Sequence, residues 1–583
     1  MEKAAILHYM NGEYCFVDAA GDYVFRLRTK AGDASKVILH GRDKYIHMLK
    51  SSDKKKAEMT KIATDGITDY YEAKLSLDMI CFRYFFELID SRGESLYYGN
   101  YSFMDKKPKE IALMFDCPLK SKEEDRFLVP KWAKGKVVYQ VFPDRFSGGE
   151  NNKELWYSSP LKNWRKMYGG TLIGITEKLP YLKELGVDIL YMTPIFLSGS
   201  NHKYDTTDYF QVDPQFGSKE DLKALVDKAH SLSMYVMLDG VFNHTAMNFF
   251  AFEDLKKNGE KSRYKDWYYP KSFPLKANFG QKPNYLCFGY FGGMPKLNTA
   301  NKEVQKYIYD VVTYWMKECH IDGWRLDVGD EISHGFWKWF RKEIKAVKED
   351  ALIVGENWFY APAYLLGDEW DSIMNYHFRD AVLGFIADKT LTATEFAWKM
   401  GYMKGSIHPE TYDVLWNLID CHDTPRFLHM AKESVKKFML AAGIQILSHG
   451  CPMIYYGDEV GMTGGNDPDC RRGMHWDKER QNETVLSYYK SLLKLRKNEP
   501  CITLGEQRIV CTEDAKELVI EERSLKVNKE KCRKIVIIYH NENKTIELPE
   551  YKGKYELLKK YTFDGIVKAY EMVVLLMEGE ING

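Results

Sequence analysis

The chain has 583 residues, which is too long for one hydrophobic core and predicts two to four domains. Its 83 basic residues balance its 83 acidic residues, which argues against a nucleic acid or an acidic membrane as its partner. The 11 cysteines are scattered without a CxxC pair, which argues against a disulfide framework or a zinc site. No apolar run approaches the roughly 20 residues of a spanning helix, so we expect a cytoplasmic protein with no membrane association.

Residues 1–125 have the pattern of a β-rich domain. Apolar and polar side chains alternate over residues 23–28 and again over residues 80–88, with turn clusters between such segments. These features predict an N-terminal β-sandwich. The charged stretch at residues 120–125 then predicts a linker.

Residues 126–501 alternate between short apolar strands and amphipathic helices. This pattern predicts the α/β class and a (β/α)8 TIM barrel. The long polar and aromatic segment after the third strand, at about 245–298, predicts an inserted subdomain beside the active-site rim, and residues 502–583 predict a C-terminal β-sandwich. The eight predicted barrel strands are residues 137–142, 188–192, 235–239, 323–326, 352–355, 372–375, 414–418 and 453–456.

Three of these strands are followed by an acid: Asp327, Glu356 and Asp423. In a parallel barrel the C-terminal ends of the strands meet at one rim, where distant residues converge. An acid next to a core is costly unless it is paired, solvated or used. Three converging carboxylates indicate glycoside hydrolysis as the leading candidate. Taken alone, Asp327 beside Arg325 is also compatible with a structural ion pair, and Glu356 with a helix cap.

The surroundings of each acid suggest a role. Arg325 lies two residues before Asp327 on the same strand face, where its guanidinium is expected to keep a nucleophile ionised. Partial burial of Glu356 beside Trp358 is expected to favour the neutral form that a proton donor needs. Asp423, next to His422, is placed to stabilise an oxocarbenium-like transition state.

Four segments in order carry a family resemblance: residues 239–244 (Asp-Gly-Val-Phe-Asn-His), 323–327 (Gly-Trp-Arg-Leu-Asp), 355–358 (Gly-Glu-Asn-Trp) and 422–423 (His-Asp). Together they resemble the signature regions of the α-amylase superfamily. The resemblance implies a nucleophile, a general acid/base and a transition-state stabiliser at Asp327, Glu356 and Asp423. It further implies contacts to the sugar at the cleavage site, made by Tyr204, His244, Arg325 and His422.

Two further segments narrow the resemblance to the neopullulanase, cyclomaltodextrinase and maltogenic amylase group: residues 294–298 (Met-Pro-Lys-Leu-Asn) and residues 457–471. They imply Asp467 and Arg471 as substrate contacts, and Glu331 as a residue linked to acceptor binding. The N-terminal region resembles the starch-binding-type sandwich of that group. The resemblance implies α-glucan oligosaccharides as substrates and a homodimer in which the N-terminal domain narrows the partner's site.

Some positions depart from the family pattern. Cys421 replaces the usual Ser or Asn, with little expected effect. Relatives often carry a calcium loop after the first strand, closed by an Asp after a Gly-Gly pair, but here the loop contains Lys153 and the Gly-Gly pair precedes Thr171. A hard cation needs several oxygen ligands, so we expect no calcium, no other metal and no cofactor.

The sequence therefore predicts a retaining α-glucan hydrolase. Its expected substrates are the α-1,4 bonds of cyclomaltodextrins, maltooligosaccharides and pullulan, with some transglycosylation. Two alternatives are a related α-glucan transferase, which the 294–298 segment argues against, and a non-catalytic sugar-binding barrel, which usually lacks one of the three acids. The order of preference among the substrates does not follow from the sequence.

Overall fold

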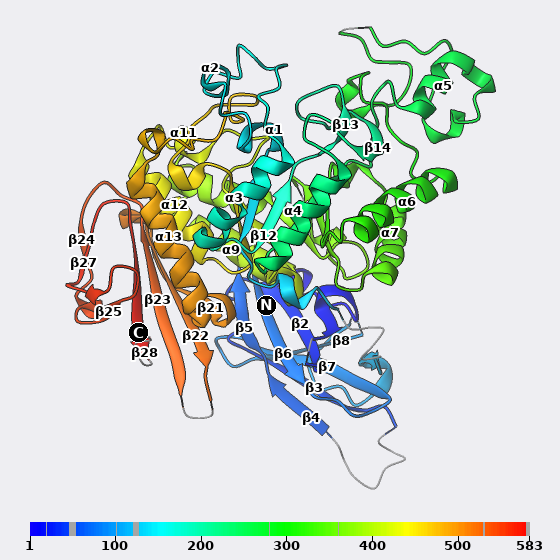
Figure 1. Cartoon of the computed structure of the whole chain (residues 1–583). Coiled ribbons are helices and arrows are strands. Elements are labelled where there is room, and N and C mark those ends of the chain that lie inside the picture. The colour runs from blue at the N-terminus through cyan, green and yellow to red at the C-terminus, as the bar shows by residue number, and fades with distance from the viewer. Residues whose placement is uncertain are drawn as a thin grey trace.

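The computed structural model describes residues 1–18, 20–45, 54–100, 102–120, 127–278, 280–359, 361–528 and 531–578. Two β-rich regions flank a barrel that is surrounded by helices (Figure 1). Most of the predicted linker, residues 121–125, lies outside the described residues, so the predicted domain boundaries stay predictions. Among the described residues, no helix combines the length and the apolar character that crossing a bilayer requires.

The N-terminal region contains two antiparallel sheets packed face to face. The alternating segment at residues 23–28 lies in β2 (Tyr23–Lys30), and all but the first residue of the segment at 80–88 lies in β7 (Cys81–Ile89); their inward side chains, such as Phe25, Tyr84 and Phe86, form one buried cluster. One sheet has the order β1 (Cys15–Val17), β2 (Tyr23–Lys30), β6 (Thr68–Leu75) and β5 (Thr60–Thr64). The other has β4 (Lys54–Glu58), β3 (Lys36–Asp43), β7 (Cys81–Ile89), β8 (Ser95–Gly99) and β9 (Ser102–Met104), with β10 (Phe115–Pro118) paired to β7.

The predicted fold class is confirmed, because eight parallel strands close into a barrel. Each overlaps a predicted strand, although the seventh has only two residues in regular pairing. Side chains such as Tyr191, Met374 and Trp416 fill the interior. The strands are β11 (Val138–Val141), β12 (Ile189–Met192), β15 (Tyr235–Gly240), β16 (Gly323–Leu326), β17 (Leu352–Asn357), β18 (Ser372–Asn375), β19 (Trp416–Asn417) and β20 (Cys451–Tyr455).

Helices cover the outside of the barrel (Figure 1). Their starts follow ordinary capping rules: Ser218 and Asp221 form a reciprocal capping box, and the Thr171 hydroxyl accepts the backbone N–H of Gly174. The main helices are α3 (Leu172–Leu185), α4 (Lys219–Ser231), α6 (Lys302–Glu318), α7 (His334–Val347), α8 (Tyr376–Ile386), α9 (Ala393–Ser406), α12 (Val435–Leu447) and α13 (Glu483–Asn498).

Two connections rise above the barrel at its rim. The hairpin of β13 (Phe196–Ser198) and β14 (Thr206–Val212) follows β12, and its connecting loop carries Tyr204. The insertion after β15 contains α5 (Phe250–Asn258) and several 3-10 turns, and Figure 1 shows α5 projecting from the body of the molecule. Both connections follow the carboxyl ends of their strands, which is the face where barrel enzymes bind ligands.

The C-terminal region forms a second antiparallel β-structure. Its main sheet has the order β21 (Glu506–Glu513), β22 (Leu518–Lys526), β23 (Cys532–His540), β28 (Glu571–Glu578), β25 (Tyr555–Glu556) and β26 (Tyr561–Thr562), and β24 (Ile546–Glu547) pairs with β27 (Ile566–Val567). Helix α9 lies close against β5 of the N-terminal region. A Cβ added to Gly401 would lie 1.9 Å from the carbonyl oxygen of Thr64, so this contact requires glycine.

Candidate active site

The structure brings the three sequence-selected acids to one cavity at the rim. Asp327 follows β16 directly, Glu356 is the second-last residue of β17, and Asp423 lies in the loop after β19. All three side chains line a cavity of about 460 Å³. Tyr204, His244, Trp358, Asp467 and Arg471 line the same cavity. Residues from six loops therefore meet around a space that can hold a small ligand.

Arg325 lies beneath this cavity and joins three carboxylates. Its side chain is fully buried on β16. Its Nη1 lies 3.0 and 2.9 Å from the two oxygens of Asp239 and 2.9 Å from Oδ1 of Asp327, while its Nη2 lies 2.8 Å from Oε2 of Glu356. One guanidinium thus contacts both carboxyl groups proposed to react, which is compatible with the separation of about 5–5.5 Å in retaining glycosidases.

In this cluster, three carboxyl groups surround one guanidinium group. Burial raises the pKa of Asp327 well above its ordinary value; Arg325 opposes the rise, and Glu356 and Asp239 add to it. Burial likewise raises the pKa of Asp239 to about 6, again against the attraction of Arg325. The guanidinium therefore acts in the expected direction, but burial outweighs it. An excess of negative charge suits a site where positive charge develops on a sugar ring.

Glu356 is held by three donors. Besides Arg325, the backbone N–H of Val328 donates to its Oε2 at 2.9 Å, and the indole N–H of Trp358 donates to its Oε1 at 2.9 Å. The indole ring stacks on Tyr376, with 4.3 Å between ring centroids. Trp358 therefore turns the polar edge of its indole to the carboxylate, and the expectation that burial beside it favours the neutral form of Glu356 stays a prediction.

Val328 has a backbone conformation that is unusual for a β-branched residue. Its φ and ψ are 46° and 45°, in the left-handed region where Cβ crowds the backbone. This conformation points its N–H at Glu356, directly after Asp327 in the chain. Strain of this kind persists where the surrounding structure holds it, and it is common at functional sites.

A hydrogen-bond network fixes Asp423. Its carboxylate lies 3.0 Å from Nη2 of Arg471 and 3.1 Å from Nε2 of His422, and the Tyr204 hydroxyl lies 2.5 Å from the same ring nitrogen. Burial lowers the pKa of His422 well below its ordinary value, so the ring is neutral. With the Gln140 amide nitrogen 2.8 Å from Nδ1, the proton of the neutral ring lies on Nε2, facing Asp423.

Comparison with known proteins agrees with this geometry. Residues 140–505 match the family model of the α-amylase catalytic domain, and residues 1–120 match that of the α-amylase N-terminal Ig-like domain. The chain belongs to the α-amylase family. The resemblance predicted from the sequence is therefore confirmed, and the chain is a glycoside hydrolase.

Similar proteins match this α-amylase family chain over most of its length. It is 40% identical to the cyclomaltodextrinase of Thermoanaerobacter pseudethanolicus, covering 96% of each chain, and 40% identical to neopullulanase 2 of Thermoactinomyces vulgaris, covering 86% of each. It is 37% identical to the intracellular maltogenic amylase of Bacillus subtilis over 94% of this chain and 92% of that protein. A solved cyclomaltodextrinase superposes with a TM-score of 0.89 at 34% identity, covering 99% and 98%.

Two of the predicted site residues, His244 and Glu331, differ in their relation to the cavity. His244 lines the cavity with its ring stacked on Phe288, and its buried Nε2 has no partner among the described residues. Burial lowers its pKa to about 3, so a neutral ring nitrogen is available to a ligand hydroxyl. Glu331 is not among the cavity-lining residues: its carboxylate lies 3.1 Å from the Asn243 amide and 3.4 Å from Nζ of Lys296.

The sequence-based selection missed several residues that line the cavity. His202 lies two positions before Tyr204, and Met294 begins the 294–298 segment. Both could have been found from the sequence, because they lie in or next to residues that the family resemblance had already selected. Asp330 lines the cavity although its neighbour Glu331 does not. Phe288 had no sequence signal, because its place beside His244 depends on the path of the long insertion. Arg325 and His422 are not among the lining residues, but they contact residues that are.

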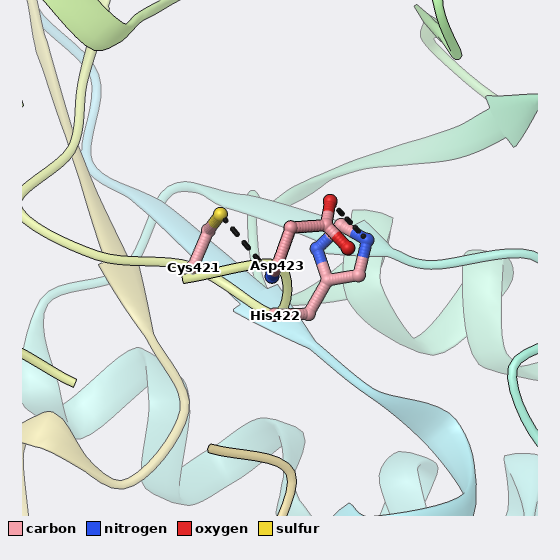
Figure 2. A group of neighbouring side chains, drawn as sticks. All are labelled: Cys421, His422 and Asp423. Carbon is pink, nitrogen blue, oxygen red and sulfur yellow. Dashed lines mark hydrogen bonds and ion pairs between the residues drawn. The ribbon is translucent and has the colours of Figure 1, made fainter. Parts of the chain in front are cut away.

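One group of potential metal ligands lies at this site, formed by Cys421, His422 and Asp423 (Figure 2). The figure shows the Asp423 carboxylate turned towards the His422 ring and the Cys421 sulfur turned towards the Asp423 backbone nitrogen. Both ring nitrogens of His422 are already engaged, and burial raises the pKa of the Cys421 thiol to about 12. Because metals bind the thiolate, these contacts favour a hydrogen-bond network over a metal centre.

Proposed function

We propose that the chain hydrolyses α-1,4-glucosidic bonds in cyclomaltodextrins, maltooligosaccharides and pullulan, with retention and with some transfer to sugar acceptors. The observation that carries the proposal is the cavity lined by Asp327, Glu356 and Asp423, with Arg325 beneath the first two. The names of the similar proteins, cyclomaltodextrinase, neopullulanase and maltogenic amylase, support this substrate class.

The proposed reaction has two steps. Glu356 gives its proton to the glycosidic oxygen while a carboxylate oxygen of Asp327 attacks the anomeric carbon, so that the C–O bond to the leaving sugar breaks as the glycosyl ester forms. A water molecule or an acceptor hydroxyl then attacks the same carbon and gives its proton to Glu356, which releases Asp327. Because the anomeric carbon is inverted twice, the product keeps the original configuration.

The remaining cavity residues are proposed to bind the sugar at the cleavage point. Asp423 is held by His422 and Arg471 and is proposed to stabilise positive charge on the ring. Arg471 also contacts Asp467 at 2.9 Å, which gives two adjacent carboxylates as acceptors for sugar hydroxyls. The Tyr204 ring is proposed as the stacking surface for the same sugar.

We propose a homodimer in the cytoplasm. The match of residues 1–120 to the N-terminal domain of the family, together with full-length relatives, supports an N-terminal domain that narrows the partner's site. The relative named as intracellular supports the location. Light scattering after gel filtration tests the assembly, and a strict monomer at assay concentration would remove this explanation of substrate preference.

We propose that the chain needs no calcium. In the loop where relatives hold the ion, the Lys153 ammonium lies 3.0 Å from Asp477, and Thr171 uses its hydroxyl to cap α3. Glu150 accepts the Ser147 hydroxyl and the Gly148 N–H. These contacts support a loop held by its own ion pair and hydrogen bonds. Tight calcium binding in a calorimetric titration of the purified protein would refute the proposal.

Product analysis tests the proposed activity. β-Cyclodextrin, pullulan and soluble starch are incubated side by side with the wild type and with Asp327→Asn, and the products are separated by chromatography. We expect short maltooligosaccharides from the wild type and almost none from the variant. Equal turnover by both would refute the nucleophile. Transfer products without net hydrolysis would favour a transferase, and binding without turnover would favour a sugar-binding barrel.

A further inference from the structure

The outer face of the β4-β3-β7 sheet carries an unusual concentration of basic side chains. In the register of these antiparallel strands, Arg42 on β3 lies opposite Lys54 on β4 and opposite Arg83 on β7. His40 lies opposite Lys56. Like charges directly opposite one another on a sheet destabilise it, so a negative charge bound near Arg42 would relieve this repulsion.

A cavity of about 490 Å³ lies over this face. Two basic residues of the segment that follows β9, Lys107 and Lys109, add to Arg42, Lys54, Lys55 and Lys56 around it, and none of the described residues that line the cavity carries a carboxylate. Three segments that are distant in sequence therefore converge to build one basic site. Figure 1 shows β3, β4 and β7 at the end of the molecule opposite α2 (Lys153–Trp156) and α5, away from the active-site rim.

Two acids on strands β7 and β10, beside the cavity, have other partners. Asp116 pairs with Arg83 at 2.6 Å and with Lys44 at 3.1 Å, and Glu87 pairs with His40 at 2.6 Å. Within the parts of the chain that the structure describes, none of Arg42, Lys54, Lys56, Lys107 and Lys109 makes an ion pair. Burial lowers the pKa of His40, and although Glu87 opposes this, Lys107 and Lys56 lower the pKa further. Five of the six lysine and arginine side chains that line the cavity thus have no ion-pair partner among the described residues.

We propose that this cavity binds an oligophosphate, meaning a compound with two or three linked phosphates. Guanidinium and ammonium groups are the usual ligands of phosphate oxygens. A phosphate monoester carries about 1.5–2 negative charges at pH 7, so two or three linked phosphates approach the charge of the five cations. The cavity volume lies in the range of small-molecule sites, well above the needs of a single small anion.

The floor of the cavity can also hold the body of an organic ligand. Phe85 is buried there with its ring stacked on His40 at 5.0 Å, and Pro108 and Met114 complete an apolar surface. The Lys107 ammonium lies 5.8 Å from the centroid of the Phe85 ring. A nucleotide or a sugar carrying linked phosphates would therefore use the floor as well as the cations, whereas inorganic tripolyphosphate would use the cations alone.

Isothermal titration calorimetry tests the proposal on the full-length protein in 150 mM NaCl without magnesium, with ATP, inorganic tripolyphosphate and AMP as probes. We expect one ATP per chain, with AMP at least tenfold weaker because it carries one phosphate. In the double variant Arg42→Gln/Lys56→Gln we expect ATP affinity to fall at least tenfold. The rate of β-cyclodextrin hydrolysis without ATP should stay unchanged, because the cavity lies away from the active site of its own chain.

The matched control removes the same charge elsewhere. Lys30 on β2 and Lys223 on α4 are exposed and make no ion pair among the described residues, so Lys30→Gln/Lys223→Gln lowers the net charge equally without touching the cavity. We expect this control to bind ATP like the wild type. The proposal is overturned if neither ATP nor tripolyphosphate binds, if binding has no fixed stoichiometry, or if the control loses affinity to the same extent.

Discussion

Two aspartates lie at opposite ends of strand β16 and should respond in opposite ways to the same substitution. Asp322 precedes the strand, and its carboxylate contacts His230 at 2.8 Å, Lys348 at 2.8 Å and the backbone N–H of Val236 at 2.9 Å. Asp327 follows the strand and shares Arg325 with other carboxylates. In barrel enzymes, residues at the N-terminal ends of the strands usually serve stability, and residues at the C-terminal ends usually serve catalysis.

Asp327→Asn should stabilise the protein while it abolishes turnover. Burial is the main cause of the raised pKa of Asp327, and Arg325 does not fully offset it; when both acids are ionised, Glu356 adds a repulsion of roughly 3 kcal/mol at about 5 Å and an effective dielectric constant of about 20. The amide keeps a hydrogen bond to Arg325 and loses only the charge-assisted part, about 1 kcal/mol. The net gain is about 2 kcal/mol at pH 8, or about 2–3 °C in Tm for a unit the size of the 140–505 match. Turnover should fall on the order of 10⁴-fold or more, as for other lost nucleophiles.

The pH dependence distinguishes this explanation from others. The pKa of Asp327 is raised in the folded state. Between the ordinary pKa of an aspartate and this raised value, the folded protein binds more protons than the unfolded chain. The stability of the protein therefore falls as pH rises through this range. The advantage of the Asn variant should therefore shrink towards pH 5. The contacts of Asp322 lower its pKa against the effect of burial, so its contribution is present above the ordinary pKa and is lost as pH falls through the folded value.

Asp322→Asn is the matched control, and it should lower stability by about 1–3 kcal/mol at pH 8 with turnover retained. Differential scanning calorimetry at pH 5 and pH 8 measures the stability of both variants, and β-cyclodextrin hydrolysis measures their turnover. A lower Tm for Asp327→Asn at pH 8 would refute the charge argument, as would a gain of equal size at both pH values.

Three further predictions concern the cavity and the connection that carries Tyr204. Lys203→Met removes a fully buried ammonium that lies 2.7 Å from Asp213, so it should cost about 3–5 kcal/mol in thermal melts, and unchanged stability would contradict the role of that pair. Trp358→Phe removes the N–H donor to Glu356; this should lower kcat about 10–100-fold with little change in KM, and an unaltered kcat in steady-state assays would argue against it. Because burial raises the pKa of Asp327, the acid limb of kcat/KM should lie above about 3.9, which rates measured from pH 4 to 8 can check.

The barrel could be predicted because its strands are buried on both faces. Such strands appear in a sequence as short apolar runs, and here the runs at residues 323–326 and 372–375 match β16 and β18 in their bounds. The seventh strand was predicted at residues 414–418, but only Trp416–Asn417 pair in the ladder, because hydrophobicity reports burial rather than hydrogen bonding. The acids at the rim were found by the same pattern, since each follows or ends an apolar run.

The supporting contacts could not be predicted in this way, because they depend on how the barrel closes. Gln140 on β11 reaches His422, which follows β19, only because β20 brings the first and the seventh strands around to one another. The indole of Trp358 was expected beside Glu356, but the direction of its N–H depends on its stacking against Tyr376 on another element. The basic cavity likewise combines three segments whose separate patterns indicate only solvated lysines.

The contacts of Arg325 explain how the fold tolerates this concentration of acids. In the proposed first step Glu356 loses a proton while Asp327 becomes an uncharged ester, so the total charge of the pair is the same before and after the step. Because Nη1 contacts Asp327 and Nη2 contacts Glu356, the guanidinium faces one ionised member of this pair in either state, in addition to Asp239. The negative charge moves from one side of a fixed cation to the other, and no charged group has to be newly buried. The energetic cost of the cluster is therefore set when the barrel folds and changes little during turnover.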